Sequence, residues 1–186
     1  VAAERCGRGA RGGSSMAIRA IVGTAVVAGC FGASTAVAET RMLVQDRAWK
    51  AFWGTTHSGL PVCGVSQETS DTYFGLKRYS GDITFTIQMG TKGWTLVNQQ
   101  KIKVLLRFDA SSPWNATGTA MHFADGGAGL EFQVDRGEAE QFMAEFGKSN
   151  LVGIQFPEGG SAEWVVSLTG SSTVQTALLG CVRSLK

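Results

Sequence analysis

The sequence predicts a mostly-β protein with a single domain, a β-sandwich or flattened barrel of about eight to ten short strands with two helices in the last third. Three observations support this prediction. Short segments in which apolar and polar side chains alternate recur along the chain, as in half-buried strands. Turns rich in glycine separate these segments. The apolar spacing changes to that of amphipathic helices only at residues 136–147 and 172–185.

The front of the chain carries signals for translation and export. Residues 1–15 are rich in arginine and glycine, and we interpret them as upstream translation and expect them to be disordered. Residues 16–38 begin with methionine, continue with an arginine and an apolar run, and end in Ala36-Val37-Ala38, as signal peptides do. We therefore expect residues 39–186 to form the single domain, and we expect it to be exported to the periplasm or secreted.

Two alternatives remain for the same segment. Val27-Ala28-Gly29-Cys30 resembles a bacterial lipobox, and lipidation of Cys30 would anchor the protein to a membrane. A retained membrane anchor is less favoured, because the apolar run is interrupted by glycines and falls short of the roughly 20 residues of a span. We expect membrane association only if Cys30 is lipidated.

The first half of the domain reads as a series of strands and hairpins. Ser80-Gly81-Asp82 is a short turn of the hairpin kind between two of the strands. In the segment after this turn, Ile83, Phe85, Ile87 and Met89 alternate with polar residues, which predicts a half-buried strand. The expected strands are 48–56, 62–69, 73–79 and 83–89, followed by a short one at 94–97.

The second half combines strands with the two helices. Asp135 and Glu138 have the spacing of a capping box at the start of the first helix, and Ser172 and Gln175 have it at the start of the second. Gly180 inside the second helix suggests that another backbone approaches closely there. The expected strands are 102–108, 114–123, 130–134, 151–156 and 163–169.

Cys63 and Cys181 are the two cysteines of residues 39–186. An even pair in an exported protein predicts a disulfide between them. Two separate buried thiols are the alternative. The spacing of cysteine and histidine offers no zinc site, and we expect no cofactor.

The charge pattern suggests one binding surface. The net charge is +2 for the whole sequence and close to zero for residues 39–186, so we expect no nucleic-acid binding. Basic residues are concentrated between positions 77 and 107, whereas acidic residues dominate afterwards. If they share a face, that face meets an anionic partner such as a lipid head group, a polysaccharide or an acidic protein; otherwise they are solvated strand faces. These basic residues are Lys77, Arg78, Lys92, Lys101, Lys103 and Arg107.

The sequence contains no catalytic or nucleotide-binding motif. His57 with Ser66 and Asp71 is a conceivable triad, and a small hydrolase acting on cell-wall material is one alternative function. An inhibitor that inserts the loop Thr55–Pro61 into the active site of a hydrolase is another. Trp114, next to a proline, is the best candidate for an exposed sugar-stacking tryptophan.

Together, these residues resemble small exported bacterial proteins of the invasion-associated locus B type. The resemblance rests on the signal-like segment, the early Cys63, the strand Leu151–Phe156 after a helix, and the ending Trp164–Ser171. It implies a β-sandwich without enzymatic activity at the cell envelope, in some members for host interaction. We therefore expect a non-enzymatic envelope or secreted protein that binds another macromolecule, an unknown protein or envelope component.

Overall fold

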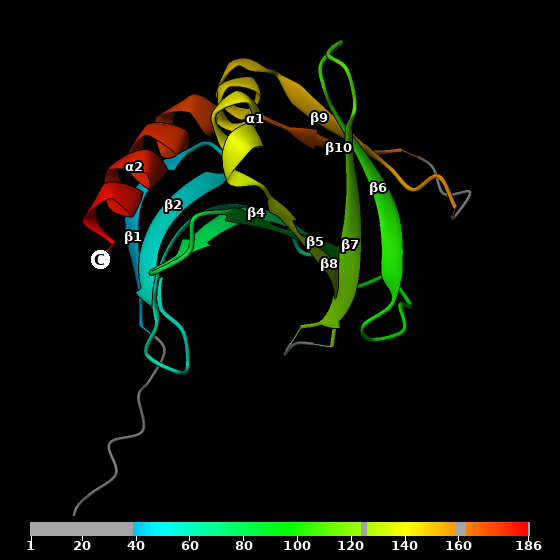
Figure 1. Cartoon of the computed structure of the whole chain (residues 1–186), viewed down its shortest axis with the longest axis horizontal. Coiled ribbons are helices and arrows are strands. Elements are labelled where there is room, and N and C mark those ends of the chain that lie inside the picture. Colours follow the sequence, from blue (N-terminus) through cyan, green and yellow to red (C-terminus); the bar gives the residue numbers. More distant parts are fainter. Residues whose placement is uncertain (1–38, 124–125, 159–162, 186) are drawn as a thin grey trace, which may run out of the picture. The chain divides into compact units, whose positions relative to one another are not determined.

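Ten strands form one continuous antiparallel sheet in the computed structural model of the chain, with two helices packed on one of its faces (Figure 1). The structure describes residues 39–123, 126–158 and 163–185, which belong to one unit, Thr35–Lys186. The interpretations of residues 1–15 and 16–38, including lipidation at Cys30, lie outside the described residues.

The mostly-β class with two late helices is confirmed. The first strands are β1 (Thr40–Asp46), β2 (Trp49–Thr55), β3 (Pro61–Glu68), β4 (Thr72–Tyr79) and β5 (Phe85–Thr91). They are followed by β6 (Lys101–Phe108), β7 (Trp114–His122), β8 (Ala128–Val134), β9 (Leu151–Gln155) and β10 (Trp164–Ser167). The helices are α1 (Arg136–Lys148), between β8 and β9, and α2 (Ser171–Ser184), after β10.

The sheet folds over so that its two ends face each other. Its strand order is β1-β2-β3-β4-β5-β8-β7-β6-β9-β10, so β10 and β1 are opposite edges. Nevertheless, the indole Nε1 of Trp49 in β2 donates to the carbonyl oxygen of Ser167 in β10 at 3.0 Å. The ring of Phe74 in β4 also meets that of Trp164 in β10 edge-on. One bent sheet thus forms the two facing layers of a sandwich, without closing into a barrel.

The core lies between these layers and is closed by the helices. Trp49 is fully buried at its centre. Its ring contacts Phe74 and Phe146, with centroids 6.2 and 5.1 Å away, in edge-to-face geometry. Phe146 comes from α1, whose buried face also carries Phe142 and Met143. The contacts of Trp49 therefore link β2, β4 and α1.

The predicted disulfide between Cys63 and Cys181 is present. It joins β3 to α2 across a Cα–Cα distance of 5.9 Å. Both cysteines belong to the core, since the apolar stripe of α2 faces the sheet, as its helical spacing predicts. Neither helix in the described part of the chain has the length and apolar composition needed to cross a membrane.

Two strand predictions differ from the structure. The edge strand β1 was not predicted, because most of its side chains are exposed and no apolar alternation marks it. Conversely, residues 94–97 are not a strand. Trp94 instead packs edge-to-face on Phe156 and Trp164, with centroids 5.2 and 5.8 Å away.

The half-buried alternation predicted for the strand after Ser80-Gly81-Asp82 is wrong. Ile83 precedes β5 and is 56% exposed, whereas Thr86 and Gln88 within it are only 2% and 6% exposed. The reason is that β5 lies in the middle of the sheet, between β4 and β8. Neighbouring side chains cover both of its faces.

The helix starts also differ from the sequence patterns. Gly170, with φ of 97°, occupies the N-cap of α2 in place of Ser172. The side-chain amide of Gln175 donates to the carbonyl oxygen of Met143 in α1 and does not reach back to a cap residue. Asp135 is the N-cap of α1, but its side chain makes no capping hydrogen bond. No backbone atom lies within 4 Å of a side chain built at Gly180, beyond its own helix and neighbours.

Candidate functional site

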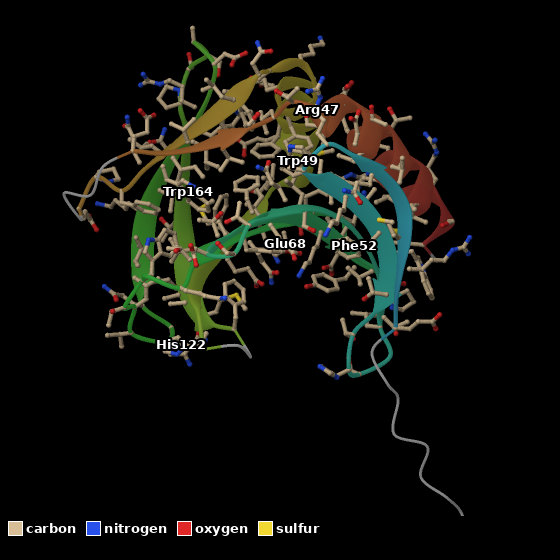
Figure 2. All side chains as sticks on the ribbon, turned by 180° about the vertical axis from the view of Figure 1, so that it is seen from behind. Arg47, Trp49, Phe52, Glu68, His122 and Trp164 are labelled. Carbon is tan, nitrogen blue, oxygen red and sulfur yellow. A yellow bond between two sulfur atoms is a disulfide. The ribbon has the colours of Figure 1, made fainter. Side chains whose placement is uncertain are left out.

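A groove of about 900 Å³ lies on the face of the sheet that is turned away from the core and the helices, where the strands arch over a hollow. In Figure 2, Phe52 and Glu68 lie on this side, whereas Trp49 points into the core on the other. Figures 1 and 2 view the sheet from opposite directions and both look along the hollow. In both views the strands arch over this side of the sheet.

Two aromatic rings cover glycines in the floor of the groove. Phe52 of β2 is directly opposite Gly64 of β3, and its ring occupies the place where a side chain at position 64 would lie. Tyr73 bends back over Gly75 in its own strand, so that a Cβ there would lie 2.5 Å from the phenol oxygen. Because glycine has no side chain, the rings can lie flat on the sheet.

A third ring extends this lining. Phe123, just after β7, lies over the opposed pair Gly90 and Gly129, where an added Cβ would be 2.5 Å from ring atoms. Its ring meets that of Tyr73 edge-on, with centroids 5.8 Å apart. Phe52, Tyr73 and Phe123, together with Met42 and Met121, give the groove a broad apolar lining.

A row of polar side chains crosses the sheet from β4 to β6, and Lys77 and Gln88 of this row line the groove. The ammonium of Lys77 in β4 donates to Oε1 of Gln88 in β5 at 2.5 Å. Nε2 of Gln88 in turn donates to Oε2 of Glu131 in β8 at 2.6 Å. Thr119 of β7 pairs with Glu131 in register and accepts a hydrogen bond from Lys101 of β6 at 2.6 Å. Glu131 is therefore linked to Lys77 through Gln88, whereas Lys101 bonds Thr119 on the strand beside it.

Burial shifts the pKa of two groups in the groove. Desolvation lowers the pKa of Lys77 below its ordinary value, and the negative charges of Glu131 and Glu68 only partly oppose this. Burial raises the pKa of Tyr73, with a smaller contribution from Glu68, so the phenol stays neutral. The Lys77 ammonium also lies 5.6 Å from the centroid of the Tyr73 ring, a cation–π contact.

Charges of both signs line the rims. Lys50 and Lys92 are cationic, and Glu68 and Asp71 are anionic. Glu68 accepts a hydrogen bond from the nearly buried Ser66 at 3.3 Å. The groove therefore combines aromatic rings with polar side chains and with charges of both signs.

The six basic residues predicted as one surface are divided by the structure. Lys77 and Lys92 line the groove. Arg78 projects from the opposite face of β4, where it donates to the carbonyl oxygen of Asp82 at 3.0 Å and lies over the ring of Phe85.

The other three basic residues share one face of β6. Lys101 bonds Thr119, and Lys103 forms an exposed ion pair with Glu158 at 2.7 Å. This hydrogen-bonded partner raises the pKa of Lys103. Arg107 is exposed further along the strand. A single basic face comprising all six residues does not form.

His57, Ser66 and Asp71 all line the groove, but they do not form a triad. Ser66 donates to Glu68, Asp71 accepts from Ser70 at 3.1 Å, and no hydrogen bond of the described residues joins His57 to either. His57 belongs to the hairpin loop Thr55–Pro61, where backbone and side-chain bonds to Thr56 fix the turn.

Metal binding and sugar stacking concern two further sets of residues. Within the described ranges, no cluster of three or more His, Cys, Asp or Glu side chains is arranged to hold a metal ion. Trp114 is half-buried, and its Nε1 donates to Oε2 of Glu145 in α1 at 2.8 Å. Its ring packs on Phe142 with centroids 5.3 Å apart, so this candidate for an exposed stacking tryptophan packs against α1.

The aromatic lining was missed in the sequence, although a signal for it exists. Gly64, Gly75, Gly90 and Gly129 all lie inside strands, where glycine is unfavourable unless something approaches the backbone closely. The partner of each glycine depends on strand register, which these segments do not reveal.

The fold and the groove define a small disulfide-linked β-protein with a trough on the open side of its sheet. No protein-family model matches the sequence, and no curated protein matches it. The structure is similar to the crystal structure of invasion associated protein B from Bartonella henselae, with a TM-score of 0.52 and 11% sequence identity. The match covers 77% of this chain and 99% of that one. It confirms the resemblance in fold that the sequence suggested.

Proposed function

We propose that this chain is an exported, non-enzymatic protein that binds an extended segment of another macromolecule in the groove. The observation that carries the proposal is the apolar lining formed by Phe52, Tyr73 and Phe123 on the open side of the sheet. The three rings are half-buried and Met42 beside them is 58% exposed, and apolar side chains that line an open groove are typical of a ligand-binding site.

The shape and composition of the groove support binding of a partner. Aromatic residues and methionine are enriched where proteins bind other proteins, and flexible methionine side chains adapt to varied ligands. Here Met42 and Met121 accompany the three rings. The groove of about 900 Å³ is large enough to hold several side chains of a bound segment.

Export is supported by the disulfide. Bonds such as Cys63–Cys181 persist in the periplasm and outside cells, whereas cytosolic thiols are kept reduced. The similarity in fold to an invasion associated protein supports a setting at the envelope or in host interaction. Intact mass spectrometry of the protein from fractionated cells tests this. We expect a soluble species that begins at Glu39, whereas a membrane-bound species that begins at lipidated Cys30 would make it a lipoprotein.

The non-enzymatic assignment is supported by the placement of polar groups. Ser66 and Asp71 engage neighbours other than His57, so these three described residues do not assemble an activated nucleophile. The alternative of a cell-wall hydrolase predicts release of fragments from purified peptidoglycan. We expect no release of fragments. Release by the unchanged protein that is lost in His57→Ala would show that the chain is a hydrolase.

The binding proposal is tested by selection followed by mapping. A displayed random-peptide library is selected on the exported protein, and one selected peptide is titrated into isotope-labelled protein by NMR. We expect the largest shift changes at Phe52, Tyr73 and Phe123. The double variant Phe52→Ala/Phe123→Ala, checked for folding by circular dichroism, should lose binding.

A matched control removes exposed charge outside the groove. Lys103→Met should bind as the unchanged protein does, because Lys103 of β6 pairs with Glu158 and does not line the groove. Shift changes confined to Lys101, Lys103 and Arg107 would move the binding site to β6. Selection of no binder to the unchanged protein would count against the proposal.

A further inference from the structure

We propose that the segment bound in the groove is an acidic polypeptide, with one carboxylate flanked by apolar side chains and anchored by the ammonium of Lys77. This inference rests on the proposed function, because it assigns the chemistry of the ligand to the same groove. It makes Lys77 a specificity-determining residue, and it names a partner that Phe52, Tyr73 and Phe123 alone do not define.

Lys77 has capacity for a ligand. An ammonium group has three donors, and the hydrogen bond to Gln88 uses one. Among the described residues, the remaining contact of this ammonium is the cation–π contact with Tyr73. Two donors are therefore left for a group that enters the groove.

The charge of Lys77 is compensated only at a distance. Glu131 is reached through Gln88, whose Oε1 accepts from the ammonium while its Nε2 donates to the carboxylate. Gln88 is itself nearly buried, so this bridge fixes the position of the ammonium without pairing it directly. A partly buried cation without a direct carboxylate contact gains more from a ligand carboxylate than an exposed lysine does.

The rest of the lining favours a polypeptide over other anionic partners. Glu68 and Asp71 line the groove together with Lys77 and would repel a polymer charged along its whole length, such as an acidic polysaccharide. A flat anionic membrane would meet the same carboxylates and does not enter a trough. A peptide can place one carboxylate at Lys77 and apolar side chains against the three rings.

The test compares substitutions of Lys77 in the protein with substitutions of the acidic residue in the peptide. Peptides selected on the unchanged protein should share an Asp or Glu between apolar residues. Lys77→Met should weaken binding of such a peptide by about tenfold or more, since a hydrogen-bonded charge is lost. Replacing the peptide's Asp by Asn, or its Glu by Gln, should cost the same in the unchanged protein and nothing further in Lys77→Met. Lys77→Arg should retain most of the affinity, and Lys103→Met should retain all of it.

Each outcome separates this inference from the proposed function. Groove binding that is indifferent to both Lys77→Met and the peptide change would overturn the acidic ligand and leave the binding function standing. Absence of groove binding altogether would overturn both. Oligogalacturonate and phosphatidylglycerol vesicles serve as competing probes. If either binds in a Lys77-dependent way while no selected peptide does, the polypeptide assignment is wrong.

Discussion

Phe52 lies across Gly64 on the neighbouring strand, and the two residues are paired directly in the register of β2 and β3. A methyl group at position 64 would overlap the ring and lie 3.0 Å from the carbonyl oxygen of Leu76. We therefore expect Gly64→Ala to lower the free energy of unfolding by about 1–3 kcal/mol, as overpacking does. Urea denaturation followed by tryptophan fluorescence measures this loss.

The cause can be isolated with a second substitution. In the Phe52→Ala background the ring is absent, so Gly64→Ala should cost clearly less than in the unchanged protein. Gly137 in α1 is the control, because nothing lies within 4 Å of an added Cβ there. Gly137→Ala should cause no loss. Equal costs of Gly64→Ala with and without the Phe52 ring would show that the ring is not the obstacle.

The disulfide should account for a large part of the stability. It closes a loop with a sequence separation of 118, for which the chain-entropy model gives about 4–5 kcal/mol. We expect Cys63→Ser/Cys181→Ser to unfold at much lower urea concentration and α2 to exchange its amide hydrogens faster. The unchanged protein should gain the mass of two hydrogen atoms on reduction. A double variant as stable as the unchanged protein would contradict this role.

Strands with one buried face could be predicted from the sequence, whereas the groove could not. In β6, Val104, Leu106 and Phe108 are buried and alternate with exposed residues, as the sequence predicted. In β5 the alternation gave a wrong prediction, because Thr86 and Gln88 are buried although they are polar. Apolar–polar alternation indicates that a strand has one buried face only where its polar side chains are exposed to water.

The disulfide and the groove show the same distinction. Cys63 has a single possible partner within residues 39–186, so the number of cysteines was enough to predict the pairing. The Lys77–Gln88–Glu131 row depends on the order β4-β5-β8, in which β8 is distant in sequence. Side chains that meet across such a sheet are not marked by any local pattern.

We expect the side chain of Asp109, just after β6, to stabilise the start of β9 by hydrogen bonds. Its carboxylate accepts from the backbone N–H of Asn150 at 3.0 and 3.1 Å and from that of Leu151 at 3.1 Å. Its own φ is 44°, a conformation that Asn and Gly tolerate better than Ala. We expect Asp109→Ala to destabilise most, by about 1–3 kcal/mol.

Two further substitutions at this position separate the contributions. Asp109→Gly should lose only the hydrogen bonds, and Asp109→Asn should remain closest to the unchanged protein, because its amide oxygen still accepts. Thermal unfolding of the three variants gives the order. If Asp109→Gly is as stable as the unchanged protein, the carboxylate contributes nothing.

The opposite pKa shifts of Lys77 and Lys103 give predictions of opposite sign. Burial lowers the pKa of Lys77 below 10.5, so between the two pKa values the unfolded state binds more protons and the contribution of Lys77 to stability rises with pH. The melting temperature of the unchanged protein minus that of Lys77→Met should therefore increase from neutral pH to about pH 10. Glu158 raises the pKa of Lys103, so the corresponding difference for Lys103→Met should decrease as the pH rises through that pKa. Differential scanning fluorimetry from neutral pH to about pH 11 measures both differences, and parallel trends for the two lysines would show that Lys77 is not desolvated.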